Sequence, residues 1–175
     1  MQETALATCL QSMSRTKKSI FAILCADRCV RIFDYNYLEG APELQGGISV
    51  AIGSVYSVAE HLSEIKEAIA RLEKVIPDLD EVGSQHTCAM GAGVSVLYAL
   101  NAVISGNEKD VILASSNALD AVDSFSEYNG QGRQEELLWQ ERALRKLQGL
   151  PERTDIKQLR DALNSSPPAW EREWL

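Results

Sequence analysis

The sequence has little of several residue types that common catalytic and metal sites require. Its 175 residues include only two histidines and four cysteines, and aromatic residues make up 6%. No CxxC pair occurs, and the Cys and His residues are too few for a recognisable zinc pattern. The EF-hand spacing and the Glu-x-x-His pattern of di-iron bundles are also missing. We therefore expect no cofactor and no metal ligand, and the composition favours a non-enzymatic protein.

Charged side chains are missing from one long stretch of the chain. None occurs between Glu81 and Glu108, although 24% of all residues are charged. A helix that is apolar nearly all round must be buried on most sides, so this stretch predicts a central core helix. Its length would allow a membrane span. However, polar residues interrupt it, and the aromatic belts and basic flank of a membrane helix are missing, so we expect no membrane association.

The N-terminus lacks a basic segment followed by an apolar one, so we expect no secretory signal. Buried thiols in a reducing compartment are the expected state of the cysteines. Together these features predict a cytoplasmic protein.

Strand patterns are missing as well, because no stretch alternates with period two between hairpin turns. Apolar residues recur instead at helical spacing, with one stripe from Ile48 to Ile76 sustained over about eight turns. The sequence predicts an all-α single-domain bundle of six or seven helices around the central apolar helix, over residues 1–165, with a Pro/Trp-containing tail at 166–175. Besides that stripe, the expected helices are the central one, which follows its cap Ser84 and runs to Ile104, and those over residues 4–13, 15–35 (capped by Ser14), 108–128, 133–148 and 155–163.

Small residues cluster inside the expected central helix. Gly91, Ala92 and Gly93 have almost no side chain, so another helix can approach closely at this point. A Gly-rich phosphate loop would need a preceding strand, and the pattern predicts none. The cluster is therefore interpreted as a packing feature.

Negative charge is concentrated in the middle of the chain. The formal net charge is −8, and residues 38–130 hold four Lys or Arg against fourteen Asp or Glu. Such a surface repels nucleic acid and attracts a basic protein. The alternative is a solvated surface that keeps the protein soluble. The acidic candidates for partner binding are Glu60, Glu64, Glu67, Asp120, Asp123 and Glu127.

The tail contributes two further candidates for partner binding. Trp170 and Trp174 are four residues apart and would share one face of a helix. Trp is an efficient interface anchor, although the tail could equally pack on its own domain.

Short motifs give the chain a resemblance to a known family. They are Leu72-Glu73-x2-Ile76-Pro77 with Asp78 and Asp80, Ala99-Leu100, and Ala114-Ser115 with Val122; Phe21-Ala22, Leu24-Cys25, Arg28, Glu141 and Leu144 add to them. With these, about the first 150 residues resemble a bacterial helical family, domain of unknown function 416. The resemblance implies an all-helical cytoplasmic protein and carries over no catalytic residues. The chain departs from the family pattern after Cys25, where Ala26-Asp27-Arg28 intervene, and the Trp tail lies outside the resemblance.

Three functions remain open at this point. The first is an acidic binding protein, most specifically an immunity (antitoxin-like) protein that neutralises a basic toxin by direct contact. The second is an enzyme or small-ligand protein with a carboxylate or metal pocket, because Asp120, Asp123 and Glu127, or alternatively Asp78, Asp80 and Glu81, could together face a cation. The third is a helical scaffold or homodimer.

Overall fold

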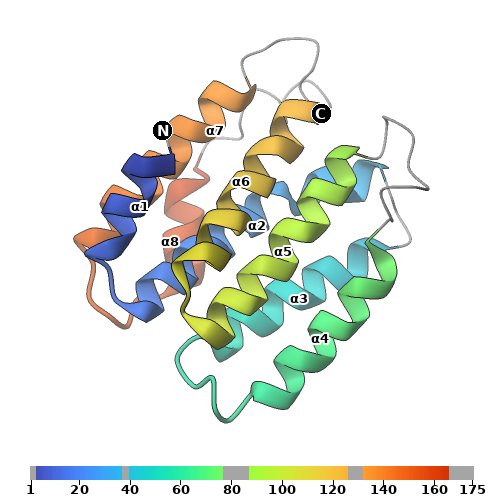
Figure 1. Ribbon diagram of the computed structural model, residues 1–175, viewed down its shortest axis with the longest axis horizontal. Coiled ribbons are helices and arrows are strands. Elements are labelled where there is room, and N and C mark those ends of the chain that lie inside the picture. The colour runs from blue at the N-terminus through green and yellow to red at the C-terminus, as the bar shows by residue number, and fades with distance from the viewer. Residues whose placement is uncertain (1–2, 37–39, 77–86, 126–131, 166–175) are drawn as a thin grey trace.

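The computed structural model is a single bundle of packed α-helices (Figure 1). It describes residues 3–36, 40–76, 87–125 and 132–165, and these parts of the chain contain eight helices and no strand. The predicted all-α single-domain fold is confirmed, with a count slightly above the expected six or seven. The helices are α1 (Glu3–Gln11), α2 (Arg15–Asn36), α3 (Ala41–Ser54), α4 (Leu62–Val75), α5 (Thr87–Ser105), α6 (Glu108–Phe125), α7 (Gly132–Gln148) and α8 (Ile156–Leu163).

The extra helix arises because the predicted long stripe from Ile48 to Ile76 is two helices. The prediction of one continuous helix is wrong: α3 ends at Ser54, and α4 begins at Leu62 and packs against α3. Between them the backbone makes short-range turn bonds, such as Glu60 N–H to the Ser57 carbonyl at 3.0 Å. The interruption of seven residues equals about two helical turns, so the apolar spacing stays in phase across it.

The start of α3 also differs from the prediction. The stripe was expected to begin at Ile48, but the helix begins at Ala41, after Gly40 as N-cap, so Gly46 and Gly47 lie inside it. A Cβ on Gly47 would meet Val96 Cγ1 at 3.1 Å and Leu72 Cδ1 at 3.2 Å. Glycine at this position therefore lets α3 approach α4 and α5 closely.

Two helices, and not one, occupy the centre of the bundle. The predicted central helix α5 is largely buried and packs against α2, α3, α4 and α6. Helix α2 is equally central, because every residue from Ser19 to Ala26 is buried and it contacts α3, α5, α6 and α7. The sequence emphasised α5 alone, since α2 has charged residues on both sides of its buried run.

The close helix approach predicted at Gly91 is confirmed. A Cβ there would lie 3.2 Å from both the Ala121 Cβ and the Asn117 carbonyl oxygen on α6. In Figure 1, α5 and α6 run side by side over their length. Ser95 adds a buried hydrogen bond between them, with its Oγ donating to the Ala114 carbonyl at 2.7 Å.

The basic first turn of α2 is explained by the ends of other helices. Arg15 donates to the carbonyl oxygens of Val103 and Ile104 at the C-terminal end of α5. Lys17 donates to the Gln148 carbonyl, the last residue of α7, at 3.3 Å. Cations are unfavourable at a helix N-terminus but favourable at a C-terminus. Here the tertiary contacts offset the unfavourable local placement.

By length and composition α5 could cross a membrane, and no other helix among the described residues could. Most of it is buried inside the bundle. This arrangement is typical of the core helix of a soluble protein, as the sequence predicts.

Candidate functional site

The first acidic group lies at the start of α4. Glu60 precedes the helix, Glu64 and Glu67 lie one turn apart within it, and all three are exposed. His61 Nδ1 lies 3.1 Å from the Glu64 carboxylate, and Ser63 Oγ donates to Glu67 at 3.5 Å. Among the residues that the structure describes, none of the three carboxylates forms an ion pair with a lysine or arginine. We call Glu60, Glu64 and Glu67 the α4 acidic face.

The second acidic group, on α6, has its own counterion. Asp120 and Asp123 are exposed, and each lies 3.1 Å from a guanidinium nitrogen of Arg133 on α7. One arginine therefore offsets part of the charge of both carboxylates. Sequence spacing places the two aspartates on one helix face, as the structure confirms, but it did not anticipate Arg133.

The two acidic groups do not form one surface. Figure 1 shows α4 at the lower right of the bundle and the C-terminal end of α6 at the top, with α5 between the two helices. The remaining candidates, Glu127, Trp170 and Trp174, lie outside the described residues.

A buried polar network lies where α2, α7 and α8 meet. This flank of the bundle is opposite the α4 acidic face (Figure 1). Arg28 Nε donates to Glu136 Oε2 at 2.6 Å, and the two side chains are 7% and 1% exposed. A second guanidinium nitrogen of Arg28 donates to Asn164 Oδ1 at 3.1 Å. The Arg28 guanidinium also lies over the Trp139 ring, 4.6 Å from its centroid. This geometry combines a charge-assisted hydrogen bond with a cation–π contact.

The network extends from α7 to α6. Gln140 Nε2 donates to Glu136 Oε1 at 3.3 Å and to the Ser115 carbonyl at 3.2 Å. Ser115 Oγ donates in return to Gln140 Oε1 at 2.7 Å. Both oxygens of the Glu136 carboxylate therefore have partners, which a buried carboxylate requires.

Burial changes the protonation of the groups around this network. Burial raises the pKa of Glu136, and the nearby Arg28 charge opposes that shift. Burial, and then the charge of Glu136, raises the pKa of both the Cys25 and the Cys29 thiol. The thiolate is the nucleophilic form of cysteine, and a raised pKa lowers its population at neutral pH. Burial thus disfavours the thiolate form of both cysteines beside the network.

The sequence interpretation missed this network because the apolar residues in the first half of α7 are not the ones that face inward. Leu138 is 53% exposed and Leu137 is half-buried. In the second half, Ala143, Leu144 and Leu147 are buried. Extending their spacing backwards in steps of three and four reaches the buried residues of the first half, which are Gly132, Glu136, Trp139 and Gln140. That register was the available signal, and the polar residues concealed it.

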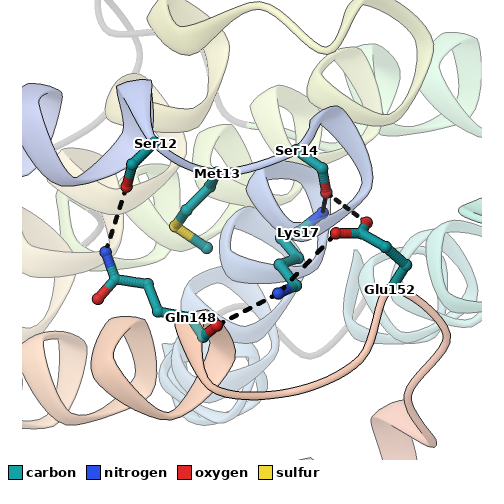
Figure 2. Close-up of a pocket in the computed structure, with 6 residues that line it drawn as sticks. All are labelled: Ser12, Met13, Ser14, Lys17, Gln148 and Glu152. Carbon is teal, nitrogen blue, oxygen red and sulfur yellow. Dashed lines mark hydrogen bonds and ion pairs between the residues drawn. The ribbon is translucent and has the colours of Figure 1, made fainter.

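A pocket of about 240 Å³ lies where the α1–α2 turn meets the end of α7 (Figure 2). Lys17 Nζ lies 3.9 Å from Glu152, and Ser14 Oγ donates to the same carboxylate at 2.5 Å. Gln148 Nε2 donates to Ser12 Oγ at 3.5 Å. As Figure 2 shows, these polar side chains contact one another across the pocket, and they hold the two turns together.

Among the described residues, no group of three or more His, Cys, Asp or Glu side chains could hold a metal ion. Asp120 and Asp123 face Arg133, and the loop carboxylates Asp78, Asp80 and Glu81 lie outside the described residues.

Comparisons of this chain with known protein families, with curated proteins and with solved structures found no match. The resemblance to domain of unknown function 416 therefore stays a prediction.

Proposed function

We propose that this chain is a non-enzymatic binding protein that captures a basic protein partner through the α4 acidic face. The observation that carries the proposal is the exposure of Glu60, Glu64 and Glu67 without a Lys or Arg counterion among the described residues. Exposed carboxylates without a Lys or Arg counterion attract a cationic partner and speed the encounter. Asp120 and Asp123 contribute less, because each already forms an ion pair with Arg133.

The most specific form of the proposal is a cytoplasmic immunity protein. Such a protein would cover the basic active site of a toxin with its acidic face and block it by contact. Charge complementarity would make capture fast, and desolvated contacts at the centre of the interface would make release slow.

The test compares two double charge reversals that change the net charge equally. Glu60→Lys/Glu67→Lys alters the α4 acidic face. Glu141→Lys/Asp161→Lys is the control, because it alters one carboxylate on α7 and one near the end of α8, away from α4. These two carboxylates pair with Arg145 and Arg160. Wild type and both variants serve as immobilised full-length bait for proteins from cells that naturally produce the chain.

The expected result is a basic protein that wild type and the α7–α8 variant retain and the α4 variant loses. With that protein purified, the association rate constant of wild type should fall about tenfold or more from low to high salt. Equal retention by both variants, or an association rate that is independent of salt, would remove the proposal. A partner that is an active toxin in isolation and inactive in the complex would establish the immunity form.

The two alternatives have less support. A metal or carboxylate pocket lacks a converging group among the described residues. For a homodimer, the described surface offers a single exposed large hydrophobic residue, Leu138.

A further inference from the structure

We propose that α8 is a strap that closes over Arg28 and Trp139 and opens from its C-terminal end, with Asn164 as the contact that holds it shut. This inference is independent of the proposed function, because it concerns the flank formed by α2, α7 and α8 and not α4.

The first observation is the position of Asn164 at the end of α8. Its side-chain oxygen accepts two hydrogen bonds, one from Arg28 on α2 and one from Trp139 Nε1 on α7, each at 3.1 Å. A carbonyl oxygen has two lone pairs, so both are used. One amide group thus joins α8 to two different helices, and its withdrawal removes the side-chain acceptor of the Trp139 N–H.

The second observation is that hydrogen bonds within α8 complete both of its ends, while its stability depends on docking. Asp155 caps its first turn by accepting from Gln158 N–H at 3.0 Å, and Asn164 N–H bonds to the Arg160 carbonyl at 2.9 Å. A helix of eight residues is not stable by itself in water, so its stability comes from docking. The docked side is made by three buried side chains, Ile156, Leu159 and Leu163.

The third observation fixes which end opens. Tyr56, which follows α3, holds the chain just before α8: its hydroxyl donates to the Thr154 carbonyl at 2.8 Å and accepts from Thr154 N–H at 2.9 Å. Both backbone groups of Thr154 are thereby tied to another part of the bundle. Among the described residues, the attachments at the other end are side-chain contacts: those of Asn164, the buried Leu163 and the Arg160–Asp27 ion pair at 3.7 Å. The residues around Thr154 therefore act as the hinge.

Opening changes the surroundings of the network without disturbing the centre of the bundle. Trp139 and the outer nitrogens of Arg28 become accessible to water. The contacts of α5 with α2, α3, α4 and α6 do not involve α8, and they remain. The closed and open states thus differ in one strap and in the accessibility of one tryptophan.

The test measures amide hydrogen exchange and tryptophan quenching on the full chain. Trp170 and Trp174 are replaced by Phe in all samples, so that Trp139 is the only tryptophan. The variant is Asn164→Ala, and the matched control is Ser165→Ala, the exposed neighbour. In Asn164→Ala we expect the exchange rate of the α8 amides to rise about tenfold and the acrylamide quenching of Trp139 to rise several-fold. Exchange in α5 should stay unchanged, and Ser165→Ala should behave like the parent.

Two results would overturn the proposal. One is that Asn164→Ala raises exchange in α8 and α5 by the same factor, since α8 would then open only with global unfolding. The other is that α8 exchange and Trp139 quenching both stay at the parent level. A second variant, Tyr56→Phe, distinguishes the hinge: it should raise exchange around Thr154 and leave Trp139 quenching unchanged, and the opposite pattern would refute the direction of opening.

Discussion

Arg28 on α2 and Glu136 on α7 are 108 positions apart in the sequence, and their side chains lie 2.6 Å apart in the core. They form a charged pair that is withdrawn from water, with Asn164, Gln140 and Trp139 supplying its other contacts. Such a pair costs desolvation energy and repays it only when both partners are present.

The first prediction concerns loss of one partner of the pair. Arg28→Met or Glu136→Leu alone should lower the free energy of unfolding by about 3–5 kcal/mol, because each leaves a buried charge without its counterion. The double variant should lose markedly less than the sum of the two, because no uncompensated charge remains. Urea unfolding of the four proteins measures this coupling. Additive losses would show that the pair does not act as a unit.

The second prediction concerns pH. Burial raises the pKa of Glu136 above its ordinary value of 4.5, so the folded state binds this proton more tightly than the unfolded state. As pH rises from about 4.5 through the folded pKa, the unfolded chain loses the proton first and gains stability relative to the folded one. Over this window wild type should therefore lose stability relative to Glu136→Gln. The difference between the two free energies of unfolding, variant minus wild type, should increase with pH. Urea unfolding at several pH values tests the sign, and a difference that stays constant or falls would contradict it.

The third prediction concerns the close approach of α5 and α6. Gly91→Ala places a methyl group 3.2 Å from α6 atoms that include backbone, so overpacking costs about 1–3 kcal/mol. The better helix propensity of Ala returns about 1 kcal/mol, and we expect a net loss of about 1 kcal/mol. Gly46→Ala is the matched control, because nothing lies within 4 Å of its Cβ position in α3.

Gly46→Ala should therefore stabilise the protein by about 0.5–1 kcal/mol. Thermal unfolding of the two variants should give shifts of opposite sign, and shifts of the same sign would refute the packing argument.

The fourth prediction concerns the cap of α2. Ser14 Oγ accepts from Lys17 N–H at 3.3 Å, as expected from the sequence, and also donates to Glu152. Ser14→Ala should cost about 1 kcal/mol of unfolding free energy, whereas Ser14→Asn should keep most of the stability, because Asn caps as well as Ser. Chemical unfolding compares them. If Asn costs as much as Ala, the bond to Glu152 and not the cap is the stabilising contact.

The positions of the helices along the chain were largely predictable from the sequence. The side-chain pairs that form between helices were not. Ser14 and the start of α2, the bounds of α7 and the Asp155 start of α8 follow from caps and apolar spacing within a few residues. The break between α3 and α4 did not, because spacing that stays in phase over seven residues hides a turn. Glu60, Glu64, Glu67, Asp120 and Asp123 are exposed, but the pairing of the two aspartates with Arg133 depends on how α6 and α7 meet.

The sequence by itself determined that this chain forms an all-helical bundle with an uncharged helix buried in it and small residues where helices touch. Those properties depend on residues three or four positions apart, and the chain displays that spacing directly. Only the tertiary structure decided that Glu136, Trp139 and Gln140 face inward, that Arg28 meets them, and that α2 shares the centre with α5. The reason is physical: a buried polar residue is tolerated only if a partner meets it, and that partner is here contributed by a helix more than a hundred residues away.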